Sequence, residues 1–167
     1  MRRHYNVETA FVVPGDAVPQ QRPRFSTICG HARAYDPAKS RDYKNLVRMA
    51  SAQAMKDKPL FLHQCRLVIS VYMQIPSSWS KKKQAQALEP GFIYAPTTRG
   101  RDLDNLAKSV MDGMTGVVYK DDSQVVSLAI CKRYALKPMV EISLTGVVYI
   151  DSPLSEKEAE SDGNDRE

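Results

Sequence analysis

The amino-acid sequence predicts an α/β or α+β protein that has a small mixed β-sheet with flanking helices. Stretches rich in β-branched residues alternate with stretches whose apolar residues recur every three or four positions. Their order is strand, helix, strand, helix, helix, strand, strand, which is typical of a mixed sheet with helices packed on it. The 167 residues, 43% of them hydrophobic, are enough for one compact core.

The first third of the chain predicts a strand, a loop and a helix. Residues 7–13 predict a short strand, which Pro14-Gly15 ends. Residues 18–35 are punctuated by proline and predict an irregular loop that gathers basic side chains. Asp36-Pro37 predicts a helix start, because Asp caps free amides and Pro fits the first helical position. The helix runs to about Lys56, and its apolar face is Tyr43, Leu46, Val47, Ala50 and Ala54.

The middle of the chain predicts a second strand and a short helix. Residues 66–75 alternate and are rich in Val, Ile and Tyr, which predicts a strand. Ser78 or Ser80 then caps a short helix that continues to Leu88. Its three consecutive lysines are more typical of a solvated helix face than of a binding site. These lysines are Lys81, Lys82 and Lys83.

The last predicted elements are a helix and two strands. Residues 102–114 predict a helix with an apolar stripe. This stripe consists of Leu103, Leu106, Val110, Met111 and Met114. Residues 124–134 and 139–150 are rich in β-branched side chains and are separated by Leu136-Lys137-Pro138. They predict two strands joined as a hairpin.

The charge of the chain is unevenly distributed. It carries 24 Lys and Arg against 19 Asp and Glu, a net charge of +5. Residues 151–167 hold seven of the acids and two of the bases, so residues 1–150 carry 22 bases against 12 acids, a net charge of +10. This basic body is typical of proteins that bind polyanions, although a solubilising surface explains the charge alone equally well. We predict one domain over residues 1–150 and a disordered acidic tail over residues 151–167.

Several classes of protein are excluded by what the sequence lacks. No apolar run approaches the ~20 residues needed to span a bilayer, and the first 15 residues do not resemble a signal peptide. The three cysteines and three histidines are scattered, so neither a disulfide framework nor a thiolate zinc site is indicated. We therefore expect a cytoplasmic protein with no membrane partner.

Four carboxylates gather within 21 positions of this basic body: Asp102, Asp104, Asp121 and Asp122. Two flank the start of a predicted helix, and two lie in the turn before a predicted strand. Asp102 and Asp104 are two residues apart, so in an extended segment both point to one side, and the amides of the helix start keep them ionised. Carboxylates held in this way repel each other unless a cation neutralises them, and Mg²⁺ prefers such oxygen ligands.

A polar stripe continues along the same helix. Asp104, Lys108 and Asp112 follow at intervals of four residues, which by itself is typical of an ordinary exposed Asp–Lys pair on a capped helix. The second carboxylate pair and the basic body favour phosphodiester hydrolysis instead. That reaction needs a metal to activate water and a cation to balance charge on the phosphate. The candidate metal ligands are Asp102, Asp104 and one of Asp121 or Asp122, and the candidate cation is Lys108.

The run from Asp102 to Val126 resembles the RusA family of Holliday junction resolvases. The family motif is D-L-D-N-L-x-K, an Asp later on the same helix, and then D-D-x-Q-[IV]. The matching residues are Asp102, Leu103, Asp104, Asn105, Leu106, Lys108, Asp112, Asp121, Asp122, Gln124 and Val125. The segments PQQRPRF, HARAYDPAKSRDYKNLV and KRYALKPMVEISL also resemble the longer, phage-associated branch of the family, so the resemblance covers about residues 12–145.

The resemblance implies a homodimeric, Mg²⁺-dependent endonuclease, with Mn²⁺ as an alternative ion. Its substrate is branched DNA, the four-way junction of recombination and repair, in a bacterial or phage-infected cell. A two-fold dimer presents two sites to two strands of like polarity, which suits paired symmetric nicks. The resemblance places the catalytic carboxylates on Asp102, Asp104 and Asp122 and the functional lysine on Lys108. Asp121 is either a fourth metal ligand or a turn-former.

DNA contacts are predicted for basic side chains of the loop, of the helix after it and of the segment before Asp102. These are Arg22, Arg24, Arg33, Lys39, Arg41, Arg99 and Arg101. Phe25 either packs in the core or stacks at the junction centre, and we expect core packing. Two residues depart from the family pattern: Gly113 stands where Ala is usual, which costs the helix roughly 1 kcal/mol, and Tyr119 stands where Trp is frequent.

Three other functions remain open. The same fold and metal serve a nuclease that cuts flaps, forks or other branched DNA. A junction-binding protein without catalysis is a second alternative, although every candidate ligand is present. The tripeptide Asp102-Leu103-Asp104 also occurs as the D-x-D of glycosyltransferases, but so short a chain lacks a second nucleotide-binding unit.

Overall fold

The structure is a computed structural model of the chain, and it describes residues 2–28, 31–89 and 101–151. Its main sheet has four strands: β1 (Arg2–Pro14), β4 (Cys65–Gln74), β5 (Val125–Ala135) and β6 (Met139–Asp151). They lie in the spatial order β1-β6-β4-β5, with β6 antiparallel to both of its neighbours and β5 parallel to β4. The predicted mixed sheet with flanking helices is confirmed.

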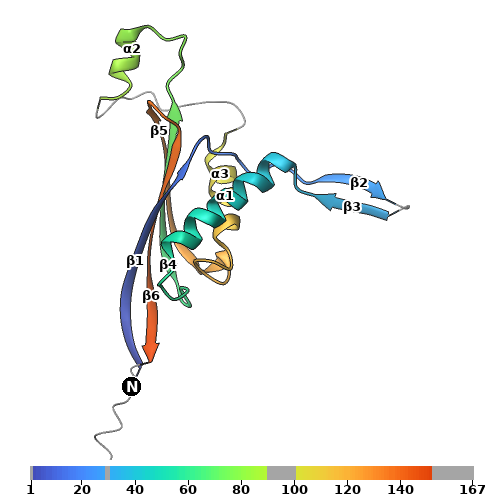
Figure 1. Ribbon diagram of the computed structural model, residues 1–167, viewed down its shortest axis with the longest axis vertical. Helices are drawn as coiled ribbons and strands as arrows, with labels where there is room; N and C mark the ends of the chain where they lie inside the picture. The colour runs from blue at the N-terminus through green and yellow to red at the C-terminus, as the bar shows by residue number, and fades with distance from the viewer. Residues whose placement is uncertain (1, 29–30, 90–100, 152–167) are drawn as a thin grey trace, which may run out of the picture.

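Two helices, α1 (Ala38–Ala54) and α3 (Leu103–Met114), lie against one face of this sheet (Figure 1). A short helix, α2 (Lys81–Gln86), stands beyond the end of β4 and β5, apart from α1 and α3 (Figure 1). Ser80 caps α2, as one of the two predicted alternatives, because its Oγ accepts from the Lys83 amide at 3.4 Å. Within the described ranges no helix is long and apolar enough to cross a membrane.

The predicted hairpin of the last two strands is wrong. β5 and β6 do not pair, because β4 lies between them and the connection 136–138 passes over its end. There the Ile75 amide donates to the Ala135 carbonyl at 3.1 Å. The burial pattern explains the order: Val140, Ile142 and Leu144 of β6 are almost wholly buried, as in a central strand, whereas β5 is half exposed, as at an edge.

The predicted loop over residues 18–35 is also partly wrong. It contains a small antiparallel hairpin of β2 (Arg24–Ile28) and β3 (His31–Tyr35), which projects away from the body (Figure 1). Its sequence signal is Gly30 between two short β-prone runs, a spacing typical of a two-residue turn. The expected cap by Asp36 does not form either, because Pro37 occupies the N-cap position and the Asp36 carboxylate pairs with Lys44 instead.

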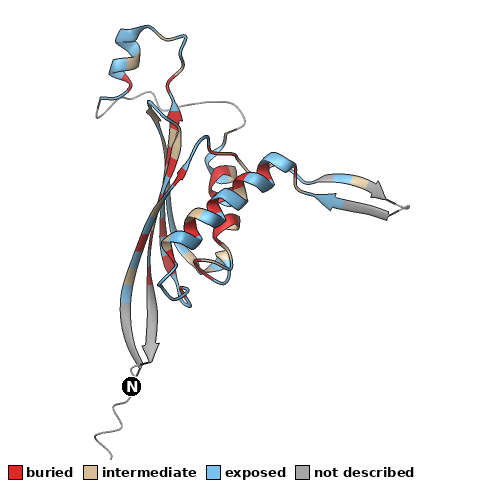
Figure 2. Ribbon diagram, viewed as in Figure 1, coloured by how far each residue is buried: buried red, intermediate tan, exposed pale blue. Residues whose placement is uncertain are grey.

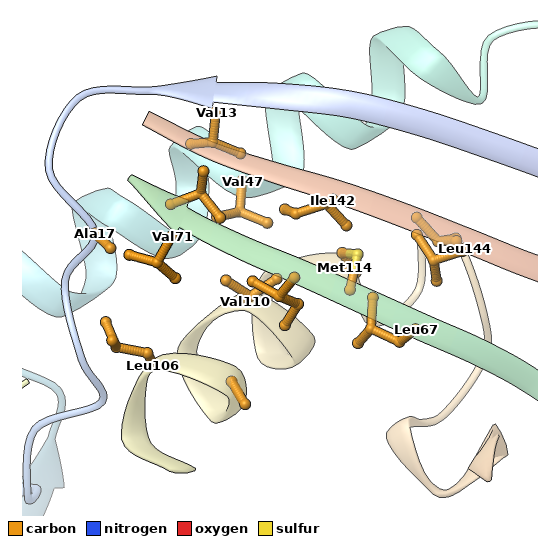
Figure 3. Close-up of a cluster of buried hydrophobic side chains, with 14 of the residues drawn as sticks. Val13, Ala17, Val47, Leu67, Val71, Leu106, Val110, Met114, Ile142 and Leu144 are labelled. Atoms are coloured by element: carbon orange, nitrogen blue, oxygen red, sulfur yellow. The ribbon is translucent and has the colours of Figure 1, made fainter. Parts of the chain in front are cut away.

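The core lies between the sheet and the two helices (Figures 2 and 3). Most residues of the two predicted apolar helix faces are buried in or packed against the core, as predicted. Leu46 and Leu103 are each 36% exposed and do not belong to the core. The confirmed core residues of the helices are Tyr43, Val47, Leu106, Val110 and Met114. The first strand is longer than the predicted 7–13, and the predicted acidic tail lies outside the described residues except for Asp151.

Gly113 allows α1 and α3 to approach closely. A Cβ atom at this position would meet Cβ and Cγ1 of Val47 at 2.8 Å and the Lys44 carbonyl oxygen at 3.0 Å. The neighbour on α1 is partly backbone, so it has little room to move aside. Glycine at this position, where the resemblance implies Ala, is therefore matched to the close crossing of α1 and α3.

We predict that Gly113→Ala destabilises the protein although Ala is the better helix former. The gain in helix propensity is about 1 kcal/mol, whereas overpacking a filled site costs about 1–3 kcal/mol. Thermal and urea unfolding should give a lower midpoint than wild type. Asn45→Ala on the exposed face of α1 is the matched control and should not lower it. A Gly113→Ala protein more stable than wild type would contradict the close approach.

Candidate active site

The first turn of α3 presents the first two predicted carboxylates to solvent. Asp102 is the N-cap residue, in extended conformation, and its carbonyl accepts from the Leu106 amide at 3.0 Å. Its carboxylate makes no capping hydrogen bond to the helix. Asp104 lies in the first turn and is exposed, with Asn105 Nδ2 at 3.5 Å from its Oδ1. The positive end of the helix dipole favours negative charge at both positions.

Two neighbouring segments hold this helix start in place. On one side the Gln20 amide donates to the Asn105 carbonyl at 2.8 Å. On the other side Lys132 Nζ of β5 donates to the Arg101 carbonyl at 3.1 Å. The guanidinium of Arg101, a predicted DNA contact, pairs with Asp16 at 3.3 Å. Arg101, directly before Asp102, is therefore bonded to β5 through its carbonyl and to Asp16 through its side chain.

Five side chains of alternating charge form a continuous series of ion pairs across the site: Asp36, Lys44, Asp112, Lys108 and Asp122. Lys44 Nζ of α1 lies 2.9 Å from Asp36 and 2.9 Å from Asp112 of α3. Asp112 also accepts from Lys108 Nζ at 3.3 Å, and Lys108 Nζ lies 3.8 Å from Asp122 Oδ2. This series of ion pairs joins the end of the β2–β3 hairpin, α1, α3 and the turn before β5. It carries the lysine predicted to be functional and one of the predicted carboxylates.

The central lysine of this series is well shielded from water. The Lys44 side chain is 17% exposed. Burial by itself lowers its pKa, but the hydrogen bonds and charges of Asp112 and Asp36 outweigh burial, so the pKa lies above its usual value. Lys44 therefore stays charged throughout the neutral range.

The turn after α3 is folded back onto the helix. Gly116 has a φ of +76°, in the left-handed region that favours glycine. Tyr119 follows, fully buried, and its hydroxyl donates to the Met111 carbonyl at 3.0 Å. Burial raises the pKa of Tyr119, so the phenol remains a hydrogen-bond donor. Tyr119 thus provides, where the family often has Trp, both packing and a bond to α3.

The two carboxylates of this turn have different surroundings. Asp121 is the N-cap of a 3₁₀ turn, Asp122–Gln124, and its Oδ1 accepts from the Ser123 amide at 2.9 Å. The hydrogen bonds from Ser123 hold the pKa of Asp121 below its usual value. Asp122 instead faces Lys108. The geometry accordingly gives Asp121 a structural part in the turn and leaves Asp122 directed at α3.

Gln124 ties the same turn to the loop before β4. Its Oε1 accepts from the amides of Lys120 at 2.8 Å and Asp121 at 3.0 Å. Its Nε2 donates to the carbonyls of Phe61 at 2.7 Å and His63 at 3.0 Å. The amide side chain is thus engaged at both ends, which accounts for glutamine at this position of the motif.

The predicted site residues are therefore partly assembled in a single chain. Lys108, Asp112 and Asp122 lie together, and Asp104 lies about 6 Å earlier along the same face of α3. Among the described residues, no three Asp, Glu, His or Cys side chains lie close enough to hold one ion between them. The donor set is nevertheless purely carboxylate, with Asp102 and Asp104 exposed and Asp122 partly exposed, and this chemistry fits a hard cation such as Mg²⁺.

The structure describes the side chains of only some of the predicted DNA contacts. Arg22 is exposed and lies two residues after Gln20, whose amide bonds to Asn105. Lys39 and Arg41 are exposed at the start of α1. For Arg24 and Arg33 only the backbone is described, on the paired strands β2 and β3, and Arg99 lies outside the described residues.

The core packing expected for Phe25 is wrong. Its side chain is 75% exposed on the projecting hairpin, where no apolar layer covers it. Of the two expected roles, only stacking outside the core is compatible with this position.

Sequence reasoning does not find the residues that position the site. The sequence marks Lys44 only as part of a basic helix face, and nothing in it singles out Gln20 or Lys132. Their partners are distant in sequence, so no local periodicity marks them. Gln124 is identified only as part of a motif, and its bonds to the loop at 61–63 become visible in the tertiary structure alone.

Comparison with known proteins places the chain in a family of DNA nucleases. The family model of the endodeoxyribonuclease RusA matches residues 14–145, a range that includes every predicted site residue. A protein of Bacillus subtilis (strain 168), described as the uncharacterized protein YqaN, is 37% identical over 138 residues. The match covers 82% of this chain and 95% of that protein. This chain belongs to the RusA endodeoxyribonuclease family of Holliday junction resolvases.

We predict that Lys44→Met lowers the free energy of unfolding by about 1–3 kcal/mol, because two half-buried carboxylates lose their shared charged partner. The raised pKa keeps this stabilisation fully present below the unfolded-state pKa of about 10.4, and it is lost only as pH rises through the folded-state value. Urea unfolding at pH 7 and pH 9 should therefore give the same deficit.

Lys39→Met, an exposed lysine of the same helix, is the control and should change stability by less than about 0.5 kcal/mol. An equal effect of the two substitutions would remove the special role of Lys44.

Proposed function

We propose that this chain is a Mg²⁺-dependent endodeoxyribonuclease that resolves four-way DNA junctions by paired symmetric nicks, acting as a homodimer inside the cell. The observation that carries the proposal is the position of Lys108 on α3, the helix whose start carries Asp102 and Asp104. Lys108 pairs with Asp112 of the same helix and with Asp122 of the turn before β5. Membership of a family of DNA endonucleases supports it.

The chemistry assigned to the site is hydrolysis of one phosphodiester bond. Asp102, Asp104 and Asp122 would hold the divalent cation, with Asp121 as turn-former or fourth ligand. When bound, the cation supplies activation of the attacking water and polarisation of the phosphate. Lys108 stabilises the negative charge that develops on the phosphate oxygens as water attacks phosphorus and the ester oxygen leaves.

The neighbouring carboxylates of Asp112 and Asp122 position Lys108 beside the candidate metal site. The ion pair with Lys44 fixes the position of the Asp112 carboxylate. Asp112 can therefore orient the side chain of Lys108. Lys108 is itself 58% exposed and so can reach a phosphate at the surface. Its link to Asp122 keeps it beside the carboxylates.

DNA would approach over the basic surface around the start of α3. Arg22, Lys39 and Arg41 are exposed there, and Arg24 and Arg33 belong to the hairpin that projects beside it. Lysine and arginine that neutralise phosphates release counterions, so binding should weaken steeply with salt. Phe25, exposed on the same hairpin, would stack on bases that are unpaired at the junction centre.

Cleavage of synthetic DNA tests the proposal. In Mg²⁺, wild-type protein should nick a four-way junction symmetrically, cut a Y-shaped fork more slowly and leave linear duplex intact. In EDTA it should cut none of these substrates. Asp104→Asn should bind the junction within about threefold of wild type but cleave it roughly 100-fold or more slowly. Asp57→Asn, in the exposed turn after α1, is the charge control and should cleave normally.

Other outcomes separate the alternatives. Equal rates on four-way, Y-shaped and linear DNA would remove the resolvase assignment in favour of a nuclease for branched DNA in general. Tight junction binding with no nicks in wild type would favour a binding protein.

We predict that Lys108→Met affects turnover more than binding, because charge that develops in the transition state is absent from the bound ground state. The single-turnover rate should fall roughly 100-fold, while junction affinity changes less than about threefold. Stability should be nearly unchanged, because Asp112 keeps its bond to Lys44. Weakened binding with a normal single-turnover rate would contradict this role.

A further inference from the structure

The segment from Trp79 to Glu89, here called the lysine lobe, is a basic surface that the proposed site does not use. Between residues 76 and 101 the chain has five bases, Lys81, Lys82, Lys83, Arg99 and Arg101, and one acid, Glu89. None of the lobe lysines forms an ion pair with a carboxylate in the part of the chain that the structure describes, unlike Lys44 and Lys108. Within the described residues, no carboxylate neutralises their charge.

The lobe contributes little to the core. No residue of α2 is buried, although Ala87 just after it is, and the helix is almost entirely exposed in Figure 2. It stands beyond the sheet, away from the layer of α1 and α3 (Figure 1). Packing of the domain core does not explain why this segment is ordered.

Interactions within the lobe and with β5 hold it in shape. Lys83 Nζ lies 3.9 Å from the centroid of the Trp79 ring, a cation–π contact. Gln84 Nε2 donates to the Trp79 carbonyl at 2.7 Å. The Trp79 ring meets Tyr134 of β5 edge to face, with centroids 5.1 Å apart at 62°. The aromatic pair thus anchors a basic helix to the edge strand.

The same strand links the lobe to the start of α3. Tyr134 and Lys132 are two residues apart on β5, so their side chains leave the same face of the sheet about 7 Å apart. Lys132 bonds to the Arg101 carbonyl, directly before Asp102. The anchor of the lobe and the anchor of the catalytic helix are therefore neighbours, and the chain itself runs from the lobe to Asp102.

We propose that the lysine lobe is a second DNA-binding surface, which holds the phosphate backbone of a junction arm on the β5 side of α3. The surface around Arg22 and the β2–β3 hairpin lies on the other side, so DNA bound at Asp102 and Asp104 is held from both flanks. Lys81 and Lys82 contact phosphates, and Lys83 stays on Trp79 to keep the lobe in shape. This inference rests on the proposed function, because it takes DNA as the ligand.

Junction binding at several salt concentrations tests the lobe. The variant is Lys81→Gln with Lys82→Gln, and the matched control is Lys56→Gln with Arg66→Gln, which removes two exposed cations outside the lobe. Binding of a labelled four-way junction is measured in EDTA, so that no strand is cut. The lobe variant should bind about 5- to 30-fold more weakly at 0.15 M salt, with a salt slope reduced by about two, one for each lysine that no longer neutralises a phosphate. The control should match wild type within about twofold.

A second readout reports on the lobe directly. Trp79 is the only tryptophan of the chain, so its fluorescence comes from the lobe alone. Junction DNA should change this emission in wild type and in the control, and change it less in the lobe variant at equal DNA concentration. Unfolding midpoints that match wild type show that the lobe variant is folded.

The outcomes separate this inference from the proposed function. If wild type binds and nicks the junction but the lobe variant keeps its affinity and salt slope, only the lobe proposal fails. An equal loss in the control also overturns it, because the effect then follows net charge alone. If wild type binds no junction, both proposals fall.

Discussion

The ion pair of Lys44 with Asp36 and Asp112 is the interaction on which the arrangement of the site depends. A lysine that is 17% exposed joins the end of the hairpin to α3 through α1, and Asp112 then orients Lys108 toward Asp122. A shielded charge with two partners is expensive to disrupt, because the remaining carboxylates would face each other in a poorly solvated place. The crossing of α1 and α3 thus sets the position of the β2–β3 hairpin end relative to Lys108 and Asp122.

The rest of the fold supports that crossing. Gly113 leaves room for Val47, so α1 approaches α3 closely enough for Lys44 to reach Asp112. The Tyr119 hydroxyl and the Gln124 amide fix the turn that carries Asp122, one to α3 and the other to the loop at 61–63. The open carboxylates of Asp102 and Asp104 remain free of capping bonds to the helix, which suits groups that bind a cation and not the backbone. The side-chain polar groups of Tyr119 and Gln124 thus hold the backbone, and the exposed carboxylates of Asp102 and Asp104 are left open to a ligand.

Much of this could be predicted from the sequence, and the failures share a cause. The helix at 103–114, the strand at 65–74 and the mixed sheet follow from periodicity and from proline and serine signals. The pairing of β5 and β6 does not, because a three-residue connection favours a hairpin and only the burial of Ile142 and Leu144 places β6 in the centre. The motif carboxylates could be named from their spacing, whereas Lys44, Gln20 and Lys132 act on partners far along the chain. Residue type alone favours the core for Phe25, and its position on a projecting hairpin leaves it exposed.

The central proposal is that Asp122, which faces Lys108, holds the cation, whereas Asp121 acts mainly as the turn-former before β5. The most direct test is the Mg²⁺ dependence of single-turnover junction cleavage for Asp122→Asn and Asp121→Asn. Asn at 121 can still cap the 3₁₀ turn, so that variant should cleave within about threefold of wild type at the same Mg²⁺ concentration. Asp122→Asn should cleave roughly 100-fold or more slowly at every Mg²⁺ concentration or need far more of the ion. The reverse result, with activity lost at 121 and kept at 122, would contradict the account.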